Sequence, residues 1–258
     1  MKFNTLIFLG LLLASSISQA ATTLVAVASN FTKPMTEIAV AFEKATGHTA
    51  NLSFGASGKF VAQLENGGPF EVFLSADEKN PKKLAQDDFA VADSQFTYAV
   101  GKLVLWSATP NYVDDQGKIL SKGGFKHIAL ADPKLAPYGA AAVELMQGME
   151  LCDKLQPLFV QGENIAQTQQ FISTGNAELG FLALSQVIEN GKIASGSGWI
   201  VPDDKHKAIL QDAILLKTGA ENPAAQALMK FLKSPEALAI IQKYGYELPK
   251  EFKLPKAA

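Results

Sequence analysis

Short apolar runs alternate with amphipathic stretches along the chain, and small polar residues stand between the two. The first unit of this kind consists of an apolar strand predicted over residues 23–28, a polar loop at 29–32, and a helix from about Pro34 to Gly47. Apolar positions within that helix recur at the spacing of a helix with one buried face. Glycine is common at the C-terminal end of helices, so Gly47 marks the predicted end.

The same unit recurs to the end of the chain. Further strands are predicted over residues 52–54, 72–75, 98–100, 103–106, 128–131, 179–182 and 209–216. Further helices are predicted around residues 60–64, 81–86 and 140–147 and from 165 onward. Two more close the chain after Asn222 and Ser234, each of which can cap a helix and precedes a proline. Strands that alternate with helices predict an α/β fold of mostly parallel sheets flanked by helices.

Residues 1–20 differ from this pattern and are typical of a secretory signal peptide. Lys2 supplies a positive charge, residues 6–14 are apolar, and small residues stand near the predicted cleavage point after Ala20. The apolar stretch is shorter than the roughly 20 residues that span a bilayer, so we expect a cleaved signal rather than a membrane anchor. The mature chain, residues 21–258, is then exported and has no stable membrane insertion.

The amino-acid composition excludes several classes of binding partner. The formal net charge of −2 argues against nucleic acid as a partner. The single cysteine, Cys152, leaves no internal disulfide and no thiolate metal site. All 23 basic residues are lysine, so the chain lacks the planar guanidinium group that binds carboxylates and phosphates through two parallel hydrogen bonds.

Four of the predicted loops between a strand and a helix consist of small or polar residues: 29–30, 56–58, 137–139 and 164–166. Ligands of open parallel sheets bind at such loops, and the first turn of each helix offers unpaired N–H groups and a partial positive charge. Several converging helix starts would bind an anion without any charged side chain. Asn30 and Ser57 would add side-chain donors, although an asparagine there is often only a turn residue and a serine only an N-cap.

A serine hydrolase is the alternative from a different class of protein. Ser57 would then need a base within hydrogen-bond reach and a glycine two residues further on, where Lys59 stands. His48, His127 and His206 are far apart in sequence and lack metal-ligand spacing. We therefore expect no catalytic residues, no bare metal ion and no enzymatic activity.

Several stretches of the chain resemble the periplasmic molybdate-binding proteins of bacterial ABC importers. They are residues 25–35 (VAVASNFTKPM), 53–64 (SFGASGKFVAQL), 72–77 (VFLSAD), 130–139 (LADPKLAPYG), 179–187 (LGFLALSQV) and 243–247 (KYGYE). The second and third of these, at this separation, are the most specific. The resemblance covers nearly the whole mature chain. It implies a two-lobed type II periplasmic-binding-protein fold with a ligand cleft between the lobes.

The family resemblance also implies how the lobes divide and what they bind. Lobe one would hold residues 21–103 and 213–258, and lobe two residues 104–212, with the chain crossing near 101–105 and 209–216. The residues implied to bind the oxyanion are Asn30, Ser57, Tyr138 and Ile165, with Ser29 and Gly58 as further contacts. The implied function is capture of molybdate, and of tungstate, in the periplasm and delivery to the importer's membrane subunits, by a monomer without a cofactor.

One position departs from the family. Many members place a tyrosine hydroxyl on the anion where this chain has Ala183, and we predict that the Tyr138 hydroxyl takes over that role. Other tetrahedral oxyanions remain alternatives. Sulfate differs from molybdate chiefly in size. A site that selects phosphate would need a carboxylate as proton acceptor, for which Asp132 and Glu163 are the nearest candidates.

Overall fold

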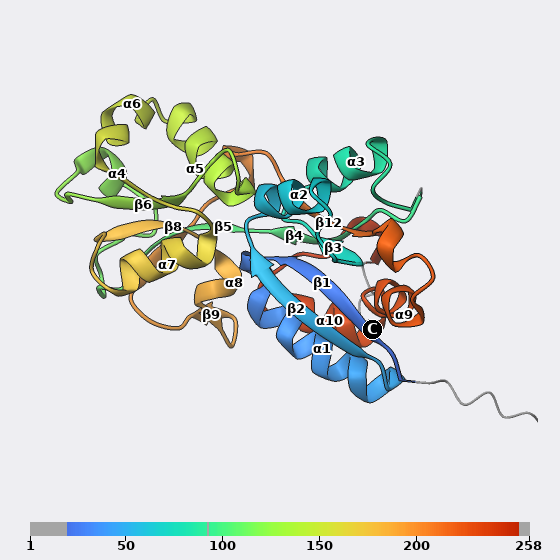
Figure 1. Ribbon diagram of the computed structural model, residues 1–258. Helices are drawn as coiled ribbons and strands as arrows, with labels where there is room; N and C mark the ends of the chain where they lie inside the picture. The colour runs from blue at the N-terminus through green and yellow to red at the C-terminus, as the bar shows by residue number, and fades with distance from the viewer. Residues whose placement is uncertain (1–19, 92, 253–258) are drawn as a thin grey trace, which may run out of the picture.

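Two α/β lobes, each built on a five-stranded sheet, make up the computed structural model, which describes residues 20–91 and 93–252 (Figure 1). The predicted signal peptide, apart from Ala20, lies outside the described residues. Within the described part, no helix combines the length and the apolar character needed to cross a membrane.

The first sheet has the strand order β2-β1-β3-β12-β4. Its strands are β1 (Thr22–Ala28), β2 (Thr49–Gly55), β3 (Val72–Leu74), β4 (Phe96–Gly101) and β12 (Ile209–Leu215). β1 pairs in parallel with β2 and β3, whereas β12 is antiparallel to β3 and β4. The parallel strands therefore end at the same edge of the sheet, and the loops that follow them lie together.

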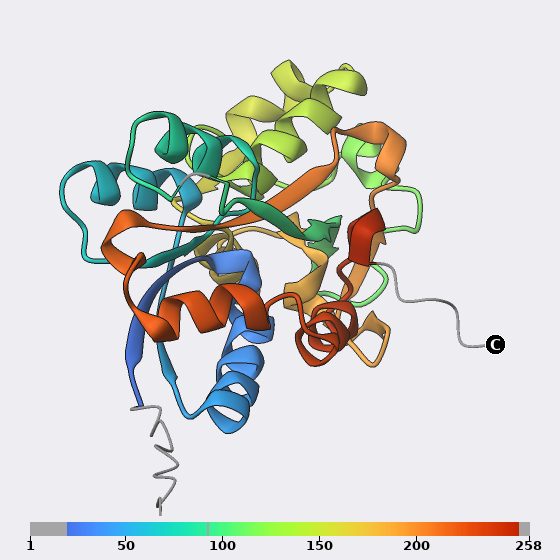
Figure 2. The ribbon, with the colours of Figure 1, turned by 90° about the vertical axis from the view of Figure 1, so that its right-hand side faces the viewer.

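Helices cover both faces of the first sheet (Figure 2). One face carries α1 (Thr32–Thr46), α9 (Pro223–Phe231) and α10 (Pro235–Lys243), and the other carries α2 (Ser57–Glu65) and α3 (Lys79–Gln86). Alternation along β1 explains this, because Val25 and Val27 pack into the core under α1, α9 and α10, whereas Ala26 packs under α2 and α3. The predicted caps form: Asn222 and Ser234 accept from the first turns of α9 and α10.

The second sheet has the order β11-β5-β8-β6-β7. Its strands are β5 (Leu103–Ser107), β6 (Ile128–Ala131), β7 (Phe159–Gly162), β8 (Leu179–Ala183) and β11 (Ser197–Ile200). In Figure 1, α5 (Pro137–Gly148) and α6 (Cys152–Leu155) lie above this sheet and α7 (Ile165–Ser173) below it. β6 is parallel to β7 and β8, and β5 is antiparallel to β8 and β11.

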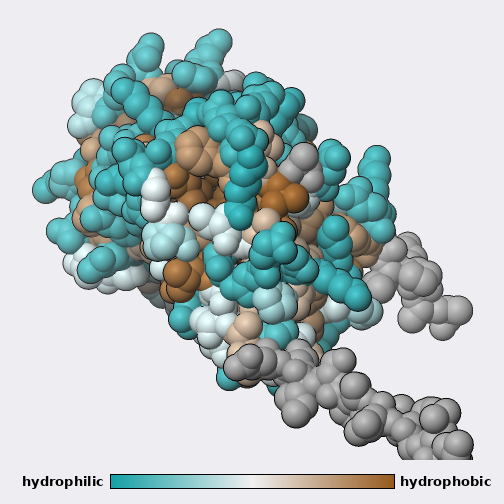
Figure 3. Space-filling model, turned by 45° about the vertical axis from the view of Figure 1, so that its right-hand side comes forward, coloured by the Kyte–Doolittle hydropathy of each residue, from teal (hydrophilic) through white to brown (hydrophobic). Residues whose placement is uncertain are grey.

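Shorter elements complete the chain. They are α4 (Ile119–Lys122), α8 (Leu184–Val187), the hairpin of β9 (Ile188–Glu189) and β10 (Lys192–Ile193), and the 3-10 helices η1 (Ser29–Phe31), η2 (Gln156–Leu158), η3 (Asp203–Lys205), η4 (Lys217–Gly219) and η5 (Lys250–Phe252). On the face of the molecule in Figure 3, hydrophilic side chains cover most of the surface and apolar ones gather near its middle.

The chain crosses between the lobes twice. β4 ends at Gly101 and β5 begins at Leu103, so Lys102 alone joins the sheets on the first crossing. On the return, residues 201–208 lead from β11 to β12, which pairs with β3 and β4 over its whole length. The division of lobes inferred from sequence stays a prediction. Its second boundary, 212/213, falls inside β12 of the first sheet.

Candidate functional site

The lobes enclose a small cavity at the carboxyl ends of β1, β2, β6 and β7. Its free volume is about 10 Å³, far below the ~300–1,000 Å³ of pockets for drug-sized ligands. Five of the six residues singled out in the sequence line it: Ser29, Asn30, Ser57, Tyr138 and Ile165. They follow four different strands, and the fold brings these separate helix starts to one point.

Three helices begin at the cavity wall and offer it backbone N–H groups. α2 starts at Ser57, α5 at Pro137 and α7 at Ile165. Proline has no N–H, so Tyr138 carries the first one of α5. The Asn164 side chain accepts from the second and third N–H groups of α7 and leaves the first, that of Ile165. Among the described residues, the N–H groups of Ser57, Tyr138 and Ile165 bond to no other group of the protein.

Two serine hydroxyls add to these amides. The Ser57 Oγ accepts from the N–H of Ala76 at 3.0 Å, which leaves its own proton free to donate. Ser29 is 6% exposed and lines the cavity, and within the described part of the chain its hydroxyl has no hydrogen-bond partner. This oxygen is not one of the described buried side-chain atoms that lack a partner, so solvent reaches it and a ligand in the cavity can take the place of that water.

The Asn30 side chain is committed inside the protein. Its Nδ2 donates to the Oε1 of Gln211 and to the hydroxyl of Tyr246, each at 2.9 Å. The Asn30 carbonyl in turn accepts from the hydroxyls of Ser185 and Tyr246. Both side-chain hydrogens of Asn30 are therefore used. What Asn30 can offer an anion is its backbone N–H, not the side-chain amide that the sequence suggested.

The Tyr138 hydroxyl lies at the crossing between the lobes rather than at the cavity. It accepts from the Nε2 of Gln211 at 3.0 Å, and a side chain at Gly101 would overlap it. Burial raises the pKa of Tyr138 well above its ordinary value, so the phenol stays protonated. The backbone N–H of Tyr138 is therefore the donor that it offers at the cavity wall, and a role of its hydroxyl in place of the family tyrosine at Ala183 stays a prediction.

Contacts between the lobes close the cavity. The N–H of Gly58 donates to the carbonyl of Leu135 at 3.0 Å. Lys59 forms an ion pair with Glu163 at 3.1 Å, and both side chains are about half exposed. Gly58, which the resemblance placed at the anion, instead joins α2 to the loop before α5, because its N–H is already bonded.

No carboxylate is among the residues that line the cavity. The Asp132 Oδ1 accepts from the N–H of Lys134, and Glu163 is held by Lys59 at the rim. Within the described ranges, no three His, Cys, Asp or Glu residues gather as a metal ion would require. The cavity therefore suits an unprotonated anion bound by neutral donors and by the positive ends of helices.

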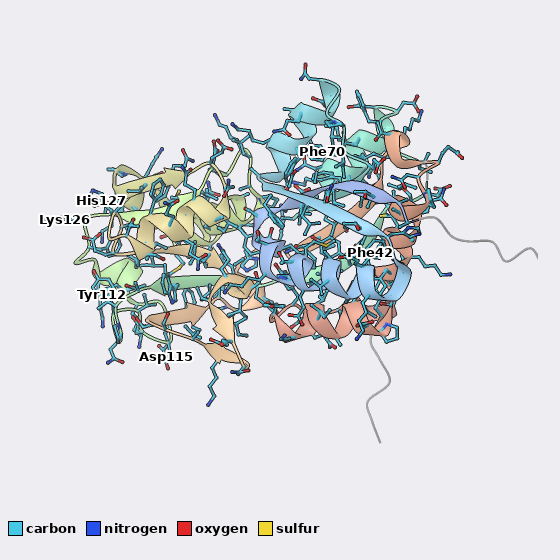
Figure 4. All side chains as sticks on the ribbon, turned by 60° about the horizontal axis from the view of Figure 1, so that its bottom comes forward. Phe42, Phe70, Tyr112, Asp115, Lys126 and His127 are labelled. Atoms are coloured by element: carbon cyan, nitrogen blue, oxygen red, sulfur yellow. The ribbon has the colours of Figure 1, made fainter. Side chains whose placement is uncertain are left out.

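Nothing in the cavity lining pairs Ser57 with a base. The lining contains no histidine. His48 directly precedes β2 and so lies at the opposite end of that strand from the cavity. His127 lies beside Glu178 at the outer end of the second lobe, far from Phe42 of the first (Figure 4). Among the residues that line the cavity, Ser57 therefore has no base of the kind that a serine nucleophile uses.

A larger and mostly apolar groove runs over the surface between α1 and α10. Val40, Ala41 and Ile240 contribute to its lining. The two helices run in opposite directions, because Lys243 at the end of α10 pairs with Glu37 near the start of α1. Their N-termini therefore lie at opposite ends of the groove, which lacks the converging N–H groups of the small cavity. The small cavity is therefore the candidate site.

The chain is similar to bacterial solute-binding proteins of known ligand. Residues 23–247 match the family model described as bacterial extracellular solute-binding protein. The molybdate-binding protein ModA of Azotobacter vinelandii is 55% identical over 240 residues, which cover 93% of this chain and 95% of that protein. The molybdate-binding protein ModA of Rhodobacter capsulatus is 57% identical over 221 residues, 86% of each chain.

A solved structure gives the same relationship in three dimensions. The periplasmic molybdate-binding protein of Azotobacter vinelandii matches with a TM-score of 0.85 at 43% sequence identity. The match covers 88% of this chain and 100% of that one. Both lobes therefore share the architecture of that protein.

Proposed function

Since the chain belongs to the family of bacterial extracellular solute-binding proteins, we propose that it captures molybdate and delivers it to an ABC importer. The resemblance to molybdate-binding proteins inferred from the sequence is confirmed by relatives at 55% and 57% identity. The two-lobed binding-protein fold is confirmed by the match to the Azotobacter vinelandii structure.

The observation that carries the proposal is the donor set of the cavity. Backbone N–H groups of Ser57, Tyr138 and Ile165 and the hydroxyls of Ser29 and Ser57 meet there, and none of the lining residues is charged. A tetrahedral dianion presents oxygen acceptors in several directions and needs donors from all sides. Each hydrogen bond to it is worth about 1.5–3 kcal/mol, and several together offset the cost of removing its water.

The same donor set favours molybdate over phosphate. Phosphate carries a proton at neutral pH, and a site that selects it needs an acceptor such as a carboxylate, of which the described lining has none. Sulfate and tungstate are unprotonated dianions like molybdate. Tungstate is nearly isosteric with molybdate, so it should bind as well, whereas sulfate differs from both in its smaller size.

The setting of this capture follows from the relatives and the sequence. We place the mature protein in the periplasm after removal of residues 1–20, as a monomer that exchanges its anion with the importer's membrane subunits. Its net charge of −2 disfavours nucleic acid as a further partner.

Calorimetric titration of the mature protein, residues 21–258, with molybdate, tungstate, sulfate and phosphate tests the proposal. Tight binding of molybdate and tungstate, with sulfate and phosphate far weaker, is the expected result. Phosphate or sulfate bound more tightly than molybdate would assign the protein to another oxyanion. No heat with any of the four would overturn oxyanion capture altogether.

A further inference from the structure

Behind the cavity, a buried group of polar side chains connects the two lobes. At its centre lies Gln211, which is fully buried on β12 next to both crossings. Its Oε1 accepts from the Asn30 Nδ2 at 2.9 Å and from the Tyr98 hydroxyl at 3.1 Å. Its Nε2 donates to the Tyr138 hydroxyl at 3.0 Å. One carboxamide thus bonds to both lobes at once.

Two of these partners carry donors of the candidate site. Asn30 belongs to η1 of the first lobe and Tyr138 to α5 of the second, and both line the cavity. Their side chains point away from the cavity toward Gln211, while their backbone N–H groups remain for the anion. The distance across the cavity between these two backbone donors is therefore tied to the geometry of the Gln211 side chain.

The crossing strand leaves this arrangement little freedom. A Cβ at Gly101 would overlap the Tyr138 hydroxyl and come within 2.7 Å of the Gln211 Nε2, so only glycine fits there. The Tyr246 hydroxyl contacts Asn30 twice: it accepts from the Asn30 Nδ2 and donates to the Asn30 carbonyl. Groups buried in such a network lose a partner only at a cost, because no water replaces it.

We infer that Gln211 is a positioning residue that sets the spacing between the anion donors of the two lobes and thereby the preference for molybdate over sulfate. The inference rests on the proposed function. Donors held at one fixed spacing cannot bond equally well to anions of different size. Side chains that lock the donors from behind make this spacing rigid, as functional sites require.

Gln211→Met tests the inference, because methionine keeps the length and volume of the side chain but makes none of its three hydrogen bonds. The Kd of molybdate is measured by calorimetry and that of sulfate by competition against molybdate. The ratio of the sulfate Kd to the molybdate Kd should fall about tenfold or more, since three hydrogen bonds no longer resist a change of spacing. A ratio within twofold of the wild-type ratio overturns the inference.

A matched control separates positioning from general loss of structure. The Gln95 Nε2 donates to Asp212, the next residue of β12, but has no partner in the second lobe. Gln95→Met should therefore leave the selectivity ratio unchanged, whatever it does to the melting temperature. A fall of the ratio as large as in Gln211→Met would show that the loss reports damage to β12, and would overturn the inference.

Tyr138→Phe provides a second, milder variant if Gln211→Met does not fold. It removes one of the three bonds and keeps the ring, so the ratio should fall several-fold. A folded Tyr138→Phe protein with an unchanged ratio also overturns the inference. Failure of the proposed function looks different, because wild-type protein would then bind no molybdate in the first place.

Discussion

Removal of the Ser57 hydroxyl is the change whose effect the structure allows to be worked out in most detail. Ser57 is 1% exposed, its Oγ accepts from Ala76, and its proton is free for the anion. Loss of one hydrogen bond to a charged acceptor, about 1.5–3 kcal/mol, should raise the molybdate Kd of Ser57→Ala roughly 10- to 150-fold. The N–H of Ala76 also loses its acceptor, which should lower the stability of the free protein by about 1–3 kcal/mol.

Two measurements on one pair of proteins separate these effects. Calorimetry with molybdate gives the change in Kd, and thermal unfolding without anion gives the change in stability. Ser107→Ala is the matched control, since the Ser107 Oγ is also buried and also accepts from a backbone N–H, that of Thr109, but lies on β5 away from the cavity. The Ser107→Ala protein should be less stable than the wild type but bind molybdate with an unchanged Kd. A Ser57→Ala protein that binds molybdate within twofold of wild type refutes the role of Ser57 as a donor.

Three further outcomes are expected. Ser29→Ala should raise the molybdate Kd by a similar factor without lowering the melting temperature of the free protein, because no protein group loses a partner; equal Kd values would exclude this hydroxyl from the site. Glu163→Gln removes the half-exposed ion pair with Lys59 and should raise the Kd less than about fivefold, an effect that calorimetry should find reduced in high salt. Burial raises the pKa of Tyr246 from its ordinary 10.0 to about 12. The folded state therefore keeps a proton that the unfolded state loses, so stability is complete below pH 10 and falls as the pH rises toward 12. In Tyr246→Phe, the melting temperature should decrease less between pH 10 and 12 than it does in the wild type. An equal decrease in both proteins would contradict the raised pKa of Tyr246.

The spacing of apolar residues is sufficient to predict the helices and strands that bury one continuous face. The helix predicted from about Pro34 to Gly47 is α1, Thr32–Thr46, and Gly47 follows it with a φ of 74°. The strand predicted over residues 209–216 is β12. The sequence pattern does not predict β7 and β11, and both are edge strands of the second sheet. Each is four residues long and only partly buried, so pairing with a neighbour, not its own pattern, makes it a strand.

The candidate site divides in the same way between local and long-range features. Helix starts and small polar loops are local, and they single out the loops at 29–30, 56–58, 137–139 and 164–166. The family resemblance then implies which residues of these loops bind the anion. The directions in which the side chains point depend on residues that are distant in the sequence. Tyr138 turns toward Gln211, 73 residues away, and Asn30 toward the same residue, 181 residues away. Such pairings depend on how β12 returns to the first sheet, which no spacing in the sequence reports.

The distribution of donors between the lobes implies an order of events. The first lobe offers the hydroxyls of Ser29 and Ser57 and the N–H groups that adjoin them, whereas the second offers the N–H groups of Tyr138 and Ile165. An anion that enters while the two lobes are apart would therefore bind the first lobe and gain the second set only when the lobes come together. At about 1.5–3 kcal/mol per bond, the two later bonds supply the free energy that favours the closed form. Closure driven in this way would depend on an anion that reaches both sets of donors.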